Sequence, residues 1–214
     1  MRAIIFANGV MDKWPAAIEL SVENDLLIAA DGGLSHCLNR QIKPHILVGD
    51  MDSVHSKDLS KLAQQGIEVI RFPKHKDQTD LQLAIQLALQ RNIQEIYILG
   101  ALGERWDMTL SNVLILASPM LKAAKVTILE NGQEIFCLHG GQDVTINGSS
   151  GDVVSLMPLA QDAVGVTLAG FEYPLNAETL SMGTTRGVSN VLKGGSARIS
   201  LRQGHLLVVI SRST

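Results

Sequence analysis

The sequence predicts an α/β fold: an N-terminal parallel-sheet α/β domain followed by a C-terminal antiparallel β-sandwich domain. Up to about residue 130, apolar runs alternate with amphipathic segments, which is the pattern of a parallel sheet with crossover helices. Beyond that point the apolar segments become short, alternate with polar residues and are separated by glycines, which is typical of an antiparallel sandwich or barrel. We therefore expect two domains, residues 1–131 and 132–214.

The N-terminal strands are expected where Ile, Leu and Val occupy successive positions, as in strands that are buried on both faces. These runs are Ala3–Ala7, Leu26–Ala30, His45–Val48, Glu68–Phe72, Glu95–Leu99 and Lys125–Leu129. Apolar residues at helical spacing predict helices over Asp80–Arg91 and Trp106–Met120.

The C-terminal strands are expected where apolar and polar residues alternate between glycine-containing turns. These runs are Val153–Met157, Val164–Leu168, Ala197–Leu201 and Leu206–Ile210. No helix-length period occurs in this part of the sequence.

Composition excludes several classes of protein. The 214 residues are 46% hydrophobic, so the chain can bury a substantial core, and its net charge of −3 argues against a nucleic-acid partner. No apolar run approaches the length that spans a membrane, and the apolar N-terminal stretch is too short for a signal peptide. The two cysteines, Cys37 and Cys137, lack a metal-binding spacing, so we expect a reduced cytoplasmic protein.

Five aspartates occur in three short clusters, each soon after a predicted strand. They are Asp31, the pair Asp50 and Asp52, and the pair Asp77 and Asp80. The carboxyl ends of parallel strands meet at one crevice, where such folds bind ligands. Carboxylates gathered there repel one another unless a cation lies among them. The pattern therefore predicts a divalent cation that carries a phosphate-bearing substrate.

Each of the first two clusters also has a structural interpretation. Asp52 or Ser53 could cap the helix that follows, instead of binding a metal with Asp50. Asp31 before two glycines is an ordinary turn, although the glycines would also let backbone amides approach a phosphate.

The third cluster precedes the predicted helix over Asp80–Arg91. Thr79 or Asp77 could be its N-cap, with Asp80 in the first turn. The functional alternative directs these groups into the crevice, with Lys76 available to a phosphate oxygen.

A glycine-rich segment follows the fifth predicted strand and opens the second predicted helix. Gly103 and Arg105 could form a phosphate cradle at the helix N-terminus. Alternatively, Arg105 and Asp107 form a surface ion pair on a flexible loop. Neither a Walker A motif nor a Gly-x-Gly-x-x-Gly fingerprint is present.

Taken in order, these motifs resemble the thiamine pyrophosphokinase family, and the resemblance extends over nearly the whole chain. They are Ala30-Asp31-Gly-Gly, Gly49-Asp-Met-Asp-Ser53, Lys76-Asp-Gln-Thr-Asp80, Gly103-Glu-Arg-Trp-Asp107 with Asn112, and Gly183-Thr-Thr-Arg-Gly-Val-Ser-Asn190. The resemblance implies that residues 1–131 form a nucleotide-binding catalytic domain and residues 132–214 a thiamine-binding domain. It also implies transfer of the terminal diphosphate of ATP to the thiamine hydroxyl, giving thiamine diphosphate and AMP, in a homodimer with active sites at its interface.

The resemblance also implies roles for individual residues. Asp50 and Asp52, with Asp77 or Asp80, would hold Mg²⁺ and phosphates, so the predicted catalytic and metal-binding residues are Asp50, Asp52, Asp77 and Asp80. The remaining residues of the nucleotide site would be Asp31, Gly32, Gly33, Lys76, Thr79, Gly103, Arg105, Asp107 and Asn112. Ser189 and Asn190 would bind the aminopyrimidine of thiamine, and Asp77 or Asp80 could accept the proton of its hydroxyl.

The fourth motif departs from the family pattern, because Glu104 and Met108 stand where a glycine and a histidine are usual. Nucleotide affinity or choice is therefore expected to differ. Three alternatives stay open: a metal-dependent transferase that uses another nucleotide donor, a receiver-like module, and a thiamine-binding protein without activity.

Overall fold

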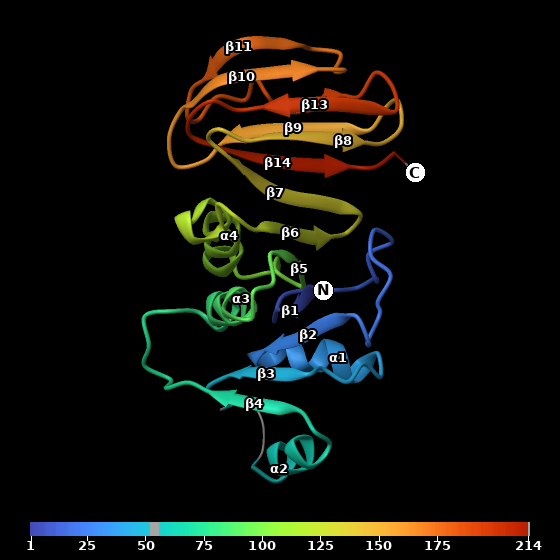
Figure 1. Ribbon diagram of the computed structural model, residues 1–214, viewed down its shortest axis with the longest axis vertical. Helices are drawn as coiled ribbons and strands as arrows, with labels where there is room; N and C mark the ends of the chain where they lie inside the picture. The colour runs from blue at the N-terminus through green and yellow to red at the C-terminus, as the bar shows by residue number, and fades with distance from the viewer. Residues whose placement is uncertain (52–55, 214) are drawn as a thin grey trace. The chain divides into compact units, whose positions relative to one another are not determined.

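The computed structural model describes residues 1–51 and 56–213, without the side chains of residues 56–59. The described chain divides into two compact units (Figure 1). The N-terminal unit contains residues 1–112 and 123–131, and the C-terminal unit contains residues 113–122 and 132–214. These units describe packing, and the domain limits expected from the sequence stay a prediction.

The N-terminal unit is built on a parallel sheet with the strand order β6-β5-β1-β2-β3-β4 (Figure 1). Its strands are β1 (Arg2–Phe6), β2 (Asp25–Ala30), β3 (Ile46–Gly49), β4 (Glu68–Arg71), β5 (Glu95–Leu99) and β6 (Lys125–Glu130). All residues of β2 and β3 are buried, as their unbroken apolar runs predict for central strands. The predicted strands are thus confirmed to within one or two residues at their ends.

Helices cover this sheet. They are α1 (Leu34–Asn39), which follows the 3-10 turn η1 (Asp31–Gly33), α2 (Ser56–Gln64), α3 (Asp80–Gln90) and α4 (Trp106–Leu114). Helix α3 packs against β1, β2 and β3, α1 against β1 and β2, and α2 against β4. The helix expected over Asp80–Arg91 is confirmed as α3, whereas α1 was not predicted and α2 was expected only as the helix that Asp52 or Ser53 could cap.

The helix expected over Trp106–Met120 is too long. Helix α4 ends at Leu114, and the chain continues in two 3-10 turns, η2 (Ile115–Ala117) and η3 (Pro119–Leu121). Ser118 between them is extended, with φ −62° and ψ 135°. Pro119 explains this conformation, because the proline ring disfavours a helical conformation in the preceding residue. Two leucines of the expected apolar stripe, Leu110 and Leu114, are exposed.

The strand order creates a ligand crevice at a defined place. From β1 the chain moves outward through β2, β3 and β4, and then returns to place β5 on the other side of β1. The strand order therefore reverses between β1 and β5, and the carboxyl edge at such a reversal is where open α/β folds bind ligands.

The C-terminal unit is an antiparallel sandwich. One group of strands has the order β12-β9-β14-β7 and the other β11-β10-β13-β8. Their bounds are β7 (Gln133–His139), β8 (Asp143–Asn147), β9 (Val153–Pro158), β10 (Ala163–Ala169), β11 (Leu175–Leu180), β12 (Asn190–Val191), β13 (Ser196–Ser200) and β14 (His205–Ser211). Apolar side chains from both groups, such as Leu156, Val166 and Val208, form one core. The predicted fold class is confirmed.

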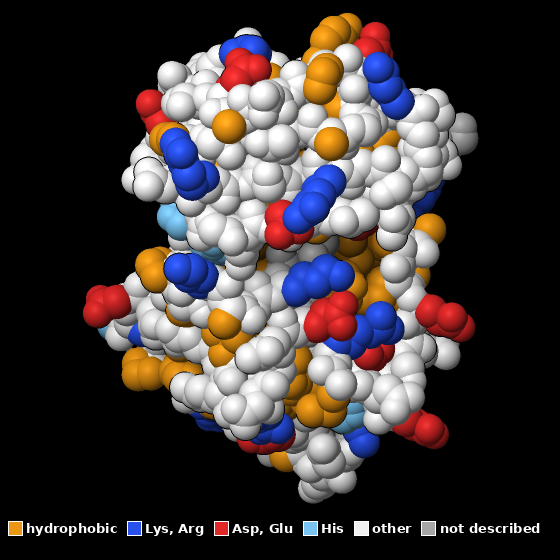
Figure 2. Space-filling model, turned by 45° about the horizontal axis from the view of Figure 1, so that its top comes forward, with side chains coloured by type: hydrophobic (Ala, Val, Ile, Leu, Met, Phe, Trp, Pro, Cys, Tyr) orange, Lys and Arg blue, Asp and Glu red, His pale blue; other side chains and the backbone are white. Residues whose placement is uncertain are grey.

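The surface carries charges of both signs. On the face shown in Figure 2, Lys and Arg side chains are interspersed with Asp and Glu. None of the helices in residues 1–51 and 56–213 is long and apolar enough to cross a membrane.

Candidate functional site

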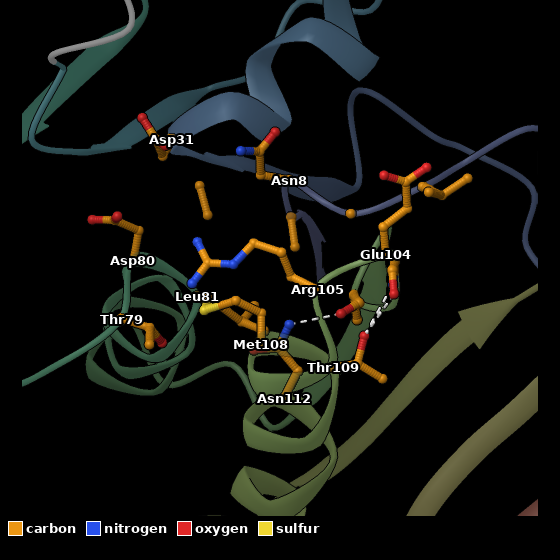
Figure 3. A pocket seen from close by; sticks show the side chains of 16 residues that line it. Asn8, Asp31, Thr79, Asp80, Leu81, Glu104, Arg105, Met108, Thr109 and Asn112 are labelled. Carbon is orange, nitrogen blue, oxygen red and sulfur yellow. Dashed lines mark hydrogen bonds between the residues drawn. The ribbon is translucent and has the colours of Figure 1, made fainter.

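A pocket opens at the carboxyl edge of the parallel sheet, within the N-terminal unit (Figure 3). Its volume is about 570 Å³, which is in the range of small-molecule sites. The segments after β1, β2 and β5 and the first turns of α3 and α4 supply its lining: Ala7, Asn8, Gly9, Val10, Ala30, Asp31, Thr79, Asp80, Leu81, Ala101, Gly103, Glu104, Arg105, Met108, Thr109 and Asn112. The pocket therefore lies at the crevice that the strand order creates.

Two of the predicted aspartates, Asp31 and Asp80, line the pocket, and Asp50 is near them. A Cβ atom on Gly49, at the end of β3, would lie 3.3 Å from Asp31 Cα, so the segment that carries Asp50 runs against Asp31. Burial raises the pKa of Asp80, and the charges of Asp31 and Asp50 raise it further. Asp31, Asp50 and Asp80 thus lie near one another, and the metal-binding and catalytic roles expected for these carboxylates stay predictions.

A lysine partly offsets this concentration of negative charge. Lys76 Nζ lies 3.1 Å from Asp80 Oδ1, and both side chains are largely buried. The ammonium group lowers the pKa of Asp80, against the larger effect of burial. Thr79 is the N-cap of α3, because its hydroxyl accepts from the Gln82 N–H at 3.2 Å. Thr79 therefore caps α3, as one interpretation of this motif expected, and it also lines the pocket.

The other two aspartates are not brought to this cluster by the described structure. Asp52 lies outside the described residues. Asp77 is exposed and does not line the pocket, although it is three residues from Asp80. Among the described residues, no three His, Cys, Asp or Glu side chains are arranged so as to enclose a metal ion.

The chemistry of the cluster nevertheless fits a hard divalent cation. Its donors are carboxylate oxygens, which Mg²⁺ prefers, and Mg²⁺ usually needs only one or two protein carboxylates beside phosphate and water oxygens. Burial and the charges of Asp31 and Asp50 both disfavour the ionised form of Asp80. A bound cation would offset this repulsion between the carboxylates. Asp50 and Asp80 are the described residues suited to hold it.

The two glycines after Asp31 have a packing role. A Cβ atom on Gly32 would clash with the Asn8 side chain, and one on Gly33 with the Phe6 carbonyl oxygen. These contacts require η1 to pass directly over the end of β1. The two glycines are therefore needed for packing beside the pocket. A contact of their amides with phosphate stays a prediction.

Asn8 is a pocket residue that the sequence analysis missed. Its side chain lies beside Asp31 in the lining and packs on Gly32 (Figure 3). The Asn8-Gly9 pair directly after the first strand was the available signal. Gly9 is likewise required, because a Cβ atom there would clash with the carbonyl oxygens of Leu102 and Gly100.

Side chains of α4 form hydrogen bonds to the backbone of the loop after β5. Asn112 is 7% exposed, and its Nδ2 donates to the Ala101 carbonyl at 2.6 Å. The Thr109 hydroxyl accepts from the Gly103 N–H at 3.0 Å and lies 3.2 Å from the Gly103 carbonyl oxygen, to which it can donate. The helix therefore fixes the backbone that lines the pocket, which gives Asn112 a positioning role.

Arg105 and Asp107 form the surface ion pair that was one interpretation of this loop. The Arg105 Nη2 atom lies 2.6 Å from Asp107 Oδ2, and the guanidinium lowers the pKa of that carboxyl group. In Figure 3, Arg105 extends from its loop towards the side where Asp31 and Asp80 lie, whereas Glu104 lies at the opposite side. Met108 also lines the pocket, so both departures from the family pattern are at the site.

The two residues expected to bind thiamine lie in the C-terminal unit and differ in exposure. Asn190 is buried, and its Oδ1 accepts from the backbone N–H groups of Tyr173 and Val191 at 3.1 Å and 2.9 Å. Its Nδ2 donates to the Tyr173 carbonyl at 2.8 Å. Ser189 is exposed and has φ +59°. The Asn190 amide thus stabilises this turn, and its Nδ2 has a second N–H beside the one that bonds to Tyr173.

Comparison with known proteins identifies the family. A model of the thiamin pyrophosphokinase catalytic domain matches residues 18–128, which is more than half of the chain. The chain belongs to the thiamine pyrophosphokinase family. A model of the thiamin pyrophosphokinase vitamin B1 binding domain matches residues 142–206, within the C-terminal sandwich.

Individual members of the thiamine pyrophosphokinase family resemble the chain over its whole length. The Bacillus subtilis thiamine pyrophosphokinase is 28% identical over 207 residues, which cover 97% of each chain. Thiamine pyrophosphokinase 1 of Oryza sativa subsp. japonica is 24% identical and is covered over 72% of its length. Crystal structures from Bacillus subtilis and Geobacillus thermodenitrificans superpose with TM-scores of 0.85 and 0.84 at 27% and 26% identity, and cover the whole of this chain.

The family assignment also bears on the alternatives. Both units match the thiamine pyrophosphokinase models, so a transferase that uses another nucleotide donor, a receiver-like module and a thiamine-binding protein without activity are not favoured. The vitamin B1 binding model also accounts for the C-terminal sandwich, which a nucleotide-sugar transferase would leave unexplained.

Proposed function

We propose that this chain transfers the terminal diphosphate of ATP to the hydroxyl of thiamine, giving thiamine diphosphate and AMP. The observation that carries the proposal is that Asp31 and Asp80 line the pocket, with Asp50 near Asp80, in the unit that matches the catalytic-domain model. The pocket's volume of about 570 Å³ is large enough for a nucleotide-sized ligand.

The acidic side of the pocket is the proposed place of the phosphates, with Mg²⁺ held by Asp50 and Asp80 and, by the sequence motif, Asp52. Bound Mg²⁺ would neutralise negative charge on the phosphate oxygens and help to align them. Asp77 is exposed, so its expected part in metal binding is the least supported of the aspartate assignments.

Two cations of the chain can stabilise the charge that develops on the transferred group and on AMP. Lys76 is already held at the acidic cluster, 3.1 Å from Asp80. Arg105 is exposed at the pocket, and its bond to Asp107 can be exchanged for a phosphate oxygen. Positioning these charges before the reaction lowers the barrier, because no reorganisation is needed when the charge develops.

The thiamine hydroxyl must lose a proton during the transfer, and Asp80 is the better candidate to accept it. Asp80 lines the pocket, where the substrates are proposed to meet. Asp77 does not line the pocket. The surplus of carboxylates also favours the approach of thiamine, which is a cation.

The test is mass spectrometry of a reaction that contains ATP, Mg²⁺ and thiamine. We expect AMP and thiamine diphosphate in equal amounts, whereas ADP with thiamine monophosphate would show an ordinary kinase instead. Asp50→Asn should abolish the product while circular dichroism stays unchanged, because the amide keeps the shape and removes the charge. Near-normal turnover of Asp50→Asn would contradict the metal assignment, and Asp143→Asn, at an exposed position in β8 of the C-terminal unit, is the matched control.

We also propose that the protein is a homodimer that uses the exposed side of α4. Trp106, Leu110 and Leu114 follow one another at helical spacing and are 74%, 55% and 54% exposed. A contiguous apolar stripe on a helix is typical of a surface that another chain covers. Sedimentation velocity should show a dimer that Leu110→Glu dissociates, and a wild-type monomer at micromolar concentration would contradict the proposal.

The cytoplasm is the proposed compartment. Cys37 and Cys137 are free thiols in the structure, as is usual for proteins in a reducing environment. Recovery of the activity in the soluble cytoplasmic fraction of the source cells would support this proposal, and its recovery with membranes would contradict it.

A further inference from the structure

A buried glutamate that lies outside both family-matched regions faces the backbone of the pocket. Glu130 ends β6, between the matched residues 18–128 and 142–206. It is 7% exposed, and its Oε2 atom is buried without a hydrogen-bond partner among the described residues. A buried carboxylate oxygen without a partner is costly, so the group needs a specific explanation.

Glu130 lies against the segments that carry the pocket lining after β5 and β1. The Leu102 N–H faces its carboxylate, and the Leu102 carbonyl accepts from the Val10 N–H at 2.8 Å. Gly9 packs so closely on Leu102 that a Cβ atom there would clash with its carbonyl oxygen. The Glu130 carboxylate therefore contacts Leu102, a residue of the β5 loop that is hydrogen-bonded to the segment after β1.

The opposite side of the same loop is already held by α4, through Asn112 and Thr109. Those bonds fix Ala101 and Gly103, on either side of Leu102. Glu130 contacts the N–H of the residue between them, whose carbonyl oxygen accepts from the Val10 N–H. A change in the charge of Glu130 would thus act on the backbone that lines the pocket rather than on the surface.

Burial raises the pKa of Glu130 to about 7, and the charge of Asp12 contributes in the same direction. Among the described residues, Asp12, in the segment after β1, is the ionisable side chain whose charge acts on it, and the Leu102 N–H favours the charged form. Ionisation of Glu130 therefore adds a buried negative charge within range of the charge of Asp12, which is exposed in the segment after β1.

We propose that Glu130 is a positioning residue for the nucleotide pocket, which it holds in the binding-competent form when it carries a proton. This inference rests on the proposed function only in taking the pocket as the Mg-ATP site. If only the protonated form is competent, the apparent Kd equals the intrinsic Kd divided by the protonated fraction. With half-protonation near neutral pH, the Kd for Mg-ATP should be roughly tenfold weaker one pH unit above the midpoint than well below it.

The experiment is isothermal titration calorimetry of the full chain with Mg-ATP in the absence of thiamine, between pH 6 and pH 8.5. Glu130→Gln is the matched variant, because the amide keeps the acceptor for Leu102 and the shape of the neutral acid. We expect the ratio of the wild-type Kd to the Glu130→Gln Kd to rise from about one at pH 6 to roughly tenfold at pH 8. Taking the ratio cancels the ionisation of ATP itself.

Asp12→Asn should change the pH dependence of Mg-ATP binding in one of two ways. Because the Asp12 charge raises the pKa of Glu130, its removal lowers that pKa, so the loss of Mg-ATP affinity should begin at lower pH if protonation alone decides competence. If repulsion by Asp12 is what opens the loops, the same variant should instead reduce the size of the rise. Either change supports the coupling, and an unchanged profile in Asp12→Asn overturns it.

Two results separate this inference from the proposed function. A constant ratio of wild-type to Glu130→Gln Kd across the pH range, with measurable binding, overturns the role of Glu130 and leaves the proposed function intact. Absence of Mg-ATP binding in both proteins at every pH overturns the proposed function together with this inference. A purely structural role would lower the melting temperature of Glu130→Gln and weaken binding equally at all pH values, which also contradicts the proposal.

Discussion

Removing the Asn112 side chain should weaken both the protein and its nucleotide pocket. The Asn112 Nδ2 bond to the Ala101 carbonyl is short, at 2.6 Å, and is buried. Asn112→Ala leaves that carbonyl without its partner, which costs about 1–3 kcal/mol of unfolding free energy. For a chain of this size, about 2 kcal/mol corresponds to a fall in melting temperature of roughly 4–8 °C.

The same substitution should also affect the binding of Mg-ATP, because Ala101 lines the pocket and its carbonyl oxygen accepts from this side chain. We expect the KM for ATP to rise roughly tenfold, equivalent to about 1.4 kcal/mol. The assays are differential scanning calorimetry and initial rates at saturating thiamine. Ser111→Ala, at an exposed position of α4, is the matched control and should change neither quantity.

Asn112→Asp sharpens the test through its pH dependence. The introduced carboxyl group can donate to the Ala101 carbonyl only when it is protonated, so its folded-state pKa should be raised above the unfolded value of about 3.9. Its stability relative to wild type is then fully present below that unfolded value and is lost as the pH rises through the folded pKa. An unchanged melting temperature in Asn112→Ala would refute the buried bond, and an unchanged KM in a destabilised variant would refute the positioning role.

Two further predictions concern the rest of the molecule. Thr79→Ala should lower the unfolding free energy by about 1 kcal/mol, since it removes the N-cap of α3, and Thr79→Ser should restore it in urea unfolding. In the C-terminal unit, the N–H groups of Ser149 and Ser213 lower the pKa of Asp152, so its stabilising effect is present above the unfolded value of about 3.9 and is lost as the pH falls further. The difference in unfolding free energy between wild type and Asp152→Asn should therefore be largest near neutral pH and shrink below about pH 4; a constant difference down to pH 2 would show that charge is not the cause.

Much of the fold could be read from local patterns. Unbroken apolar runs located the parallel strands, because strands buried on both faces need apolar residues at successive positions. The strongly periodic helix α3 was found almost to the residue, and its cap lies at Thr79. The short helix α1 was missed because six residues offer too little periodicity, and the end of the second predicted helix was misplaced because the effect of Pro119 on Ser118 was not considered.

The candidate site was predictable in its components but not in its assembly. The ordered motifs determined the family and named Asp31, Asp50 and Asp80, because the carboxyl ends of parallel strands must share one edge. Other features depend on contacts between segments far apart in the chain. They are the exposure of Asp77, the hydrogen bonds of the Asn190 amide to backbone groups, and the position of Asn8 in the pocket lining.

By itself, the sequence determined the fold class, the family and the residues that carry charge to the crevice, since these follow from periodicity and from the order of motifs. Only the tertiary structure decided which carboxylates meet and which are buried. Glu130 illustrates the reason: its neighbours Leu102 and Asp12 are 28 and more than 100 residues away in the chain, and its pKa is set by burial among them. Such an environment leaves no local pattern in the sequence, because it is created by the packing of loops that the strand order brings together.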